Sequence, residues 1–172
     1  ANNNTLDCHG YKINYSTSVM GFGVNNSYIN YTTIRGCIIQ ESKGIVASDR
    51  SDGIHLRSSY FNQINNNTIQ IFRGFVINLR NNVFNTSIFN NNVSVNDSVD
   101  IIGSLGNITN NKIYNNFLSG NSTTGIQLTG ITSTVVDTYF SSNNSIYNNQ
   151  IIINDAIGII LTLQQNFNLI YD

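Results

Sequence analysis

The residues best suited to chemistry gather in one short stretch of the chain. Seven acidic, basic and imidazole side chains occur within it: Glu41, Lys43, Asp49, Arg50, Asp52, His55 and Arg57. Carboxylates beside a cation can hold calcium or act as a general base next to a charged sugar. The catalytic candidates are therefore Asp49, Arg50, Asp52 and His55. A solvated loop whose charges keep the protein soluble is the favoured interpretation, because the acids do not recur in the neighbouring repeats described below.

Histidine and cysteine offer a second kind of site. Cys8, His9, Cys37 and His55 are the only residues of these two types. A copper or zinc site needs several such ligands close together. Cys8, His9 and Cys37 could supply three ligands, but a disulfide between the cysteines and a pair of buried free thiols are the alternatives. We therefore predict no metal and no cofactor.

Acceptor sequences for N-linked sugars, Asn-x-Ser/Thr, are numerous. There are eleven, whereas the content of Asn, Ser and Thr predicts about six by chance. Charged residues make up only 10% of the chain, so glycans would supply solubility that charge does not. The sites at which we expect sugars are Asn25, Asn30, Asn85, Asn92, Asn96, Asn107, Asn121 and Asn143.

The elements that must position these residues follow from an internal repeat. A six-residue motif, Ile-x-Asn-Asn-x-Ile/Val, begins at Ile64, Ile88, Ile108 and Ile146, with degenerate copies at Leu6, Ile34 and Ile170. A second motif lies between the copies: a glycine, an apolar residue, any residue and another apolar residue. An example is Gly53-Ile-His-Leu56. Regular spacing of this kind marks a solenoid, and short β-branched segments between Asn, Ser and Gly turns favour β-coils over helical repeats. The predicted fold is all-β: a right-handed parallel β-helix of about six coils.

The Asn pair of the first motif has a structural role in such a coil. Alternation from Ile64 places Asn65 outward and Asn66 inward. Stacked amides can bond to one another and to the turn backbone, so we expect an Asn ladder. Its predicted members are Asn66, Asn90, Asn110 and Asn148. A buried Asn66 would have no room for a sugar, although it begins an acceptor sequence.

Three segments near the start of the chain carry a family resemblance. They read Thr-Leu-Asp-Cys-His-Gly-Tyr-Lys-Ile (Thr5 to Ile13), Gly-Phe-Gly-Val (Gly21 to Val24) and Thr-Ile-Arg-Gly-Cys-Ile-Ile (Thr33 to Ile39). This pattern resembles the opening of right-handed β-helix proteins of the NosD and carbohydrate-binding/sugar-hydrolase type. The resemblance implies the fold over the whole chain. It implies no single function, because such proteins include polysaccharide lyases, hydrolases, epimerases, copper-loading accessories, viral spikes and surface proteins.

Alignment of the first two repeats places Cys8 and Cys37 on adjacent coils. In an exported protein such a pair is expected to form a disulfide. The longest step between repeats predicts a loop insertion near residues 131–142. We expect residues 1–172 to form one β-helix segment of a longer chain, because both ends of the sequence lie within coils.

Composition limits the partners. A net charge of −1 leaves no basic footprint for nucleic acid, and no apolar run is long enough to span a membrane. We expect an extracellular or cell-surface location. The favoured hypothesis is a structural or adhesive module of a surface assembly, such as a filament or surface layer, that binds copies of itself, other surface proteins or carbohydrate. The alternatives are a polysaccharide-active enzyme of lyase, hydrolase or epimerase type, and a viral spike or receptor-binding module.

Overall fold

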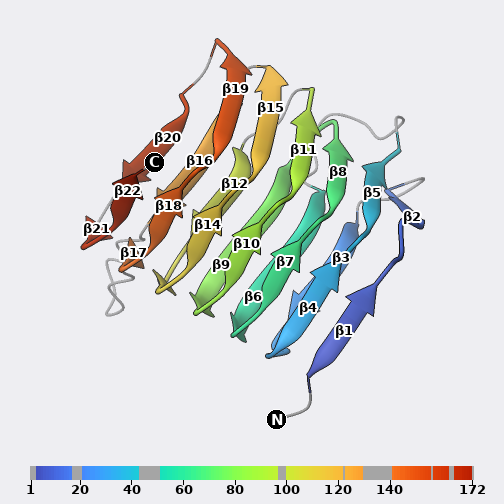
Figure 1. The fold of residues 1–172 in the computed structure, drawn as a ribbon, viewed down its shortest axis with the longest axis horizontal. Helices are drawn as coiled ribbons and strands as arrows, with labels where there is room; N and C mark the ends of the chain where they lie inside the picture. The colour runs from blue at the N-terminus through green and yellow to red at the C-terminus, as the bar shows by residue number, and fades with distance from the viewer. Residues whose placement is uncertain are drawn as a thin grey trace.

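The chain folds into parallel β-sheets that run along one axis (Figure 1). The computed structural model describes residues 3–16, 21–42, 51–96, 100–121, 123–129, 141–155, 157–162 and 165–171. Every regular element within these ranges is a β-strand. The strands form three sheets, and the two chain ends lie at opposite ends of the stack. The all-β, parallel architecture predicted from the repeat is therefore confirmed; the predicted insertion near residues 131–142 lies almost wholly outside the described residues.

Two of the sheets contain short strands only. Sheet A has seven: β1 (Asn4–Asp7), β4 (Thr32–Arg35), β7 (Gln63–Asn65), β10 (Ser87–Phe89), β14 (Lys112–Tyr114), β18 (Ser145–Tyr147) and β22 (Leu169–Tyr171). Sheet B has six: β2 (Lys12–Tyr15), β5 (Ile38–Glu41), β8 (Thr68–Ile71), β11 (Asn92–Val95), β15 (Phe117–Asn121) and β19 (Gln150–Asn154).

Sheet C contains the longest strands. Its nine members are β3 (Phe22–Ser27), β6 (Asp52–Tyr60), β9 (Phe75–Phe84), β12 (Asp100–Leu105), β13 (Ile108–Thr109), β16 (Thr124–Thr129), β17 (Ser141–Ser142), β20 (Ile159–Thr162) and β21 (Gln165–Asn166). Strand β9 pairs with β12 along its first half and with β13 at its end. The chain passes through sheets A, B and C in that order and then begins again, as expected of a β-solenoid.

The core consists of aliphatic side chains stacked in columns, to which most strands contribute one or more residues. In sheet A the register joins Leu6, Ile34, Ile64, Ile88, Ile113, Ile146 and Ile170. Ile34, Ile64, Ile88 and Ile113 are fully buried, whereas Leu6 and Ile170 at the two ends are exposed. β-Branched residues suit these positions because they pack well on a pleated surface. The repeat predicts Ile108 as a member of this column, but the column contains Ile113 instead. Ile108 lies on β13 of sheet C.

The Asn ladder exists, but the predicted members are wrong by one residue. Asn66, Asn90, Asn110 and Asn148 are exposed, and each has a left-handed φ between 52° and 57°. Asparagine tolerates this conformation, and adopting it interrupts the strand alternation from which the inward position was predicted. The next asparagine therefore points inward instead.

The first ladder lies at the corner between sheets A and B, and its members are Asn67, Asn91, Asn116 and Asn149. In Asn91, Oδ1 accepts from the backbone N–H of Asn67 at 3.1 Å and from its Nδ2 at 3.0 Å. Nδ2 of Asn91 donates to Asn116 Oδ1 and to the backbone oxygen of Ile64, both at 3.0 Å. Each buried amide is thereby saturated, and it satisfies a corner N–H that no strand pairs.

A second ladder lies at the corner between sheets C and A and joins Asn111, Asn144 and Asn168. The four motif copies thus belong to two ladders, because the copy at Ile108 lies at this second corner. Thr86 occupies the next position of the column and donates its N–H to Asn111 Oδ1 at 2.8 Å. Beyond it, Nδ2 of buried Asn62 has no hydrogen-bond partner within the described residues. Thr86 therefore interrupts the ladder.

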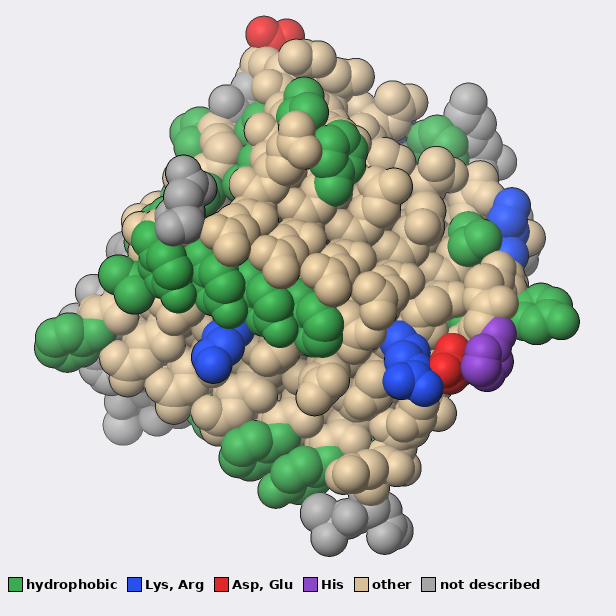
Figure 2. Space-filling model, viewed as in Figure 1, with side chains coloured by type: hydrophobic (Ala, Val, Ile, Leu, Met, Phe, Trp, Pro, Cys, Tyr) green, Lys and Arg blue, Asp and Glu red, His purple; other side chains and the backbone are tan. Residues whose placement is uncertain are grey.

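Aromatic rings form a further column on the outer face of sheet A. Phe89, Tyr114, Tyr147 and Tyr171 occupy matching positions on successive strands, with ring centroids 4.9 Å apart and planes within 8° of parallel. Figure 2 shows the row as a green stripe. Because the ring faces cover one another, mainly ring edges and hydroxyl groups remain exposed. We infer that this column stabilises sheet A rather than offering flat platforms to a ligand.

Replacing Asn91 with alanine should lower the free energy of unfolding by about 1–3 kcal/mol, because its ladder neighbours lose a partner in a buried site. Asn90→Gly is the matched control: glycine keeps the left-handed turn, so the change should be below about 0.5 kcal/mol. Denaturant unfolding measures both. A larger loss for Asn90→Gly than for Asn91→Ala would restore the inward assignment of Asn90.

Completing the second ladder should stabilise the protein. We expect Thr86→Asn to add about 1 kcal/mol, because the new Oδ1 would accept from the unpaired Nδ2 of Asn62. Thermal unfolding of this variant should be compared with that of Thr33→Asn, the same substitution on the outer face of sheet A, which should change stability by less than about 0.5 kcal/mol. A lower melting temperature for Thr86→Asn would show that the gap is not a missing amide.

Candidate functional site

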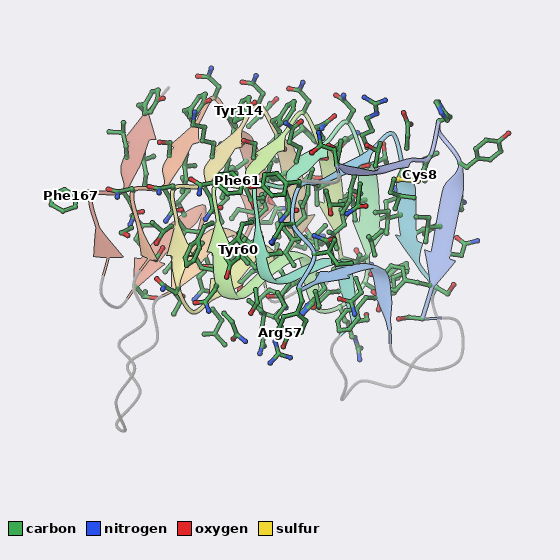
Figure 3. All side chains as sticks on the ribbon, turned by 90° about the horizontal axis from the view of Figure 1, so that it is seen from below. Cys8, Arg57, Tyr60, Phe61, Tyr114 and Phe167 are labelled. Atoms are coloured by element: carbon green, nitrogen blue, oxygen red, sulfur yellow. A yellow bond between two sulfur atoms is a disulfide. The ribbon has the colours of Figure 1, made fainter. Side chains whose placement is uncertain are left out.

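The candidate site lies on the outer face of sheet C, where β6 and β9 run side by side. Ile54 and Leu56 of β6 point into the core and are fully buried, so His55 and Arg57 point outward. The register pairs His55 with Asn78 and Arg57 with Arg80 on β9. Figure 3 shows Arg57 on the opposite side of the stack from Tyr114 of the aromatic column.

Gly53 allows β6 to approach its neighbours closely at this point. A Cβ atom added there would lie 2.6 Å from the backbone oxygen of Val76 and 3.0 Å from Cγ2 of Ile69. Any side chain would therefore push β6 away from β9. This close approach brings Asp52 and His55 against the polar face of β9.

Asp52, His55 and Asn78 form a buried hydrogen-bonded cluster. His55 Nδ1 lies 2.7 Å from Asp52 Oδ2, and Asn78 Nδ2 donates to the same oxygen at 2.8 Å. Asp52 is 3% exposed and His55 8%. An ionised carboxylate can only accept, so neutral His55 carries its proton on Nδ1 and leaves the Nε2 lone pair free. The cluster therefore holds one imidazole in a single orientation.

A groove of about 320 Å³ opens beside this cluster. Its lining residues are Phe22, Asp52, His55, Arg57, Asn78, Arg80 and Asn81. The ring of Phe22 stacks on His55 with centroids 4.5 Å apart. The guanidinium of Arg57 lies 5.7 Å from the centre of the Tyr28 ring. The groove thus combines a carboxylate, an imidazole, two guanidinium groups and an aromatic wall.

The structure brings together two of the four predicted catalytic residues. Asp52 and His55 are in contact, whereas Asp49 and Arg50, like Lys43, lie outside the described residues. Glu41 has a structural role, because its carboxylate accepts from the backbone N–H groups of Phe72 at 2.6 Å and Arg73 at 3.0 Å and from the Ser51 hydroxyl.

Glu41 and Asp52 also act on a neighbouring phenol. Burial raises the pKa of Tyr15, and the negative charges of Glu41 and Asp52 raise it further. Tyr15 therefore stays protonated and neutral over the physiological pH range, and it belongs to the core rather than to the groove.

Sequence reasoning missed Asn78, Arg80 and Phe22. A signal for two of them is present, because Ile54-His-Leu-Arg57 on β6 and Ile77-Asn-Leu-Arg80 on β9 share the pattern Ile-x-Leu-Arg. Aligning Gly53 with Gly74, as the glycine motif suggests, hides this pattern. In the observed register Gly53 lies beside Val76. Phe22 has no such signal, because only the register of β3 against β6 brings it to His55.

The remaining predicted sites lie elsewhere. Sγ atoms of Cys8 and Cys37 are bonded at 2.03 Å, which is the pairing that the sequence favoured. The disulfide withholds both thiolates from a metal, and His9 is exposed beside Asp7. Within the described ranges, no group of three His, Cys, Asp or Glu side chains could hold a metal ion. The same ranges contain no helix able to cross a membrane.

Asp52→Asn tests the geometry of the cluster. The amide introduced at this position can donate to Nδ1, so the proton of neutral His55 should move to Nε2 in a large fraction of molecules. Long-range ¹H–¹⁵N spectra of the ring distinguish the two tautomers. His9, which is exposed, should show unchanged ring signals. An Nε2–H tautomer already dominant in the unaltered protein would contradict the Asp52–His55 hydrogen bond.

Comparison of the chain with protein-family models, curated proteins and solved structures found no match in any of the three. The similarity of Thr5–Ile13 and the following segments to NosD-type β-helix proteins therefore stays a prediction.

Proposed function

We propose that this chain is a right-handed parallel β-helix of about six coils and that it serves as an extracellular, N-glycosylated structural or adhesive module of a cell-surface assembly. The cyclic passage through sheets A, B and C supports the architecture. The Cys8–Cys37 disulfide is compatible with an oxidising location outside the cell. Copies of the chain, other surface proteins and carbohydrate are the proposed partners.

The observation that carries the proposal is the placement of the acceptor asparagines. Each acceptor asparagine is exposed or half-buried; they are Asn3, Asn14, Asn25, Asn30, Asn66, Asn85, Asn92, Asn96, Asn107, Asn121 and Asn143. A ladder asparagine cannot begin an acceptor sequence, because the residue two positions later is an inward aliphatic one, such as Ile69 after Asn67. Sugars and the buried amide ladder are therefore compatible throughout the chain.

Low charge makes glycans useful to such a module. Most of the face shown in Figure 2 is neither hydrophobic nor charged, and charged residues make up only 10% of the chain. Uncharged extended sheets with open edges tend to associate. Glycans on several faces would limit this association to the surfaces that the assembly uses.

A polysaccharide-active enzyme is the second candidate, and the groove beside Asp52 and His55 favours it. Hydrolysis with two carboxylates fits poorly, since Asp52 is the only carboxylate that lines the groove within the described residues. Asp100, the other buried acid on this face, lies two strands away with Phe75 between them in the register. An enzyme would have to use the imidazole of His55 as its general base.

Sugar mapping tests the proposal. We expect the native mass of the protein from its own cells to fall on glycosidase treatment, and glycopeptides to carry sugars at several of the eight predicted sites. Asn66 should now resemble Asn85 and Asn143, because all three are exposed left-handed turn residues that immediately precede an inward position. A protein without sugars would count against the proposed function. Sugars on Asn85 and Asn143 but never on Asn66 would count against the outward placement of Asn66.

The enzyme candidate is separated by a second measurement. Replacing His55 with Gln should leave the assembly of the module unchanged, because His55 lines the groove. An unfolding curve shows whether the variant is folded. Depolymerisation of an acidic or neutral polysaccharide by the unaltered protein, and its loss in His55→Gln, would instead establish the enzyme.

A further inference from the structure

Two arginines that line the groove are partners on adjacent strands and have no counter-ion within the described residues. Arg57 and Arg80 are register partners on adjacent parallel strands, which are roughly 4.8 Å apart. Neither guanidinium group makes a hydrogen bond or ion pair within the described residues, and that of Arg57 lies over the uncharged Tyr28 ring. Like charges opposite each other on a sheet destabilise it, so the pair is stable only if something else compensates it.

The nearby carboxylate does not compensate the arginines. Asp52 Oδ2 is already bound to His55 Nδ1 and Asn78 Nδ2. Its side chain is 5% exposed and lies beneath the imidazole. The negative charge of Asp52 is therefore directed at His55, and the two guanidinium groups at the rim keep their hydrogen-bonding capacity free.

His55 adds a donor that depends on its protonation. Nδ1 is occupied by Asp52, and Nε2 makes no hydrogen bond within the described residues. Neutral His55 presents a lone pair to the groove, which would repel an anion, whereas protonated His55 presents an N–H group. Among the described residues, the charged groups around the ring are Asp52 and Arg57 on β6 and Arg80 on β9, while β3 contributes uncharged Phe22 and Asn25.

We propose that this groove binds an oxyanion, a carboxylate or sulfate group of a ligand, between the guanidinium groups of Arg57 and Arg80, with protonated His55 as a further donor. Guanidinium groups match such anions because their planar N–H pairs donate to two oxygens at once. The exposed ring of Phe22, 43% exposed, forms a wall against which the rest of the ligand can pack.

The experiment uses inorganic sulfate and glucuronate as probes at constant ionic strength, with glucose as the uncharged counterpart of glucuronate. Ring signals of His55 are followed by NMR while each probe is added, once at about pH 5.5 and once at about pH 8. Arg57→Gln and Arg80→Gln remove one arginine each. Lys112→Gln removes one positive charge from the outer face of sheet A and is the matched control. Unfolding curves without ligand confirm that each variant is folded.

We expect saturable shifts with sulfate and glucuronate, none with glucose, and tighter binding at the lower pH. Either arginine variant should bind roughly tenfold more weakly or worse, and Lys112→Gln should bind like the unaltered protein. His55→Gln should retain weaker binding that no longer changes between the two pH values. Tighter binding of glucuronate than of sulfate would assign the anion to a sugar; the reverse would assign it to a sulfate group.

Two outcomes overturn the proposal. One is the absence of saturable shifts at both pH values. The other is equal binding by the arginine variants and Lys112→Gln, which would indicate general charge attraction rather than a site.

Discussion

A chain that turns between buried parallel strands leaves backbone N–H groups at the corners without a strand partner, and the asparagine ladders satisfy them. The amide of Asn91 accepts from one coil and donates to the next, so each corner is held to its neighbours by the same group. A buried amide without partners would cost more than an aliphatic side chain at the same place. Each ladder amide therefore depends on its neighbours for hydrogen bonds. The one interruption within the described residues, at Thr86, leaves Nδ2 of Asn62 without a partner.

Two asparagines occur at such a corner because the corner needs one residue that turns the backbone and one that points inward. Asn90 adopts the left-handed conformation that turns the backbone, and Asn91 points inward to the ladder. Asparagine serves both purposes, since its short amide side chain tolerates positive φ and its four hydrogen-bonding positions suit a stack. The high asparagine content is thus explained largely by the corners and the exposed turns, before any glycan is considered.

Strand pairing and the aliphatic columns set the register of sheet C and so create the groove. His55 meets Asn78, and Arg57 meets Arg80, because this register aligns β6 with β9. The outer faces consequently differ in character. On sheet A the aromatic rings stack face to face. On sheet C the guanidinium groups of Arg57 and Arg80 make no hydrogen bond within the described residues. Function is best sought on the face with unused hydrogen-bonding groups.

The sequence alone indicated the all-β, parallel fold class and most of the aliphatic column of sheet A, because these depend on patterns that recur in nearly every coil. It also favoured the Cys8–Cys37 disulfide over a metal site and free thiols, because alignment of the first two repeats places the cysteines on adjacent coils. Leu6, Ile34, Ile64, Ile88, Ile146 and Ile170 do share one column. The ladder was predicted one residue too early, since nothing in an Asn-Asn pair says which member takes the left-handed turn, and only the packed corner decides. Asp52 and His55 could be named from their types, but Asn78, Arg80 and Phe22 could not be joined to them. These residues meet because strands of different coils approach closely. Gly53 and the strand register set this approach in the tertiary structure, and no local sequence pattern predicts it.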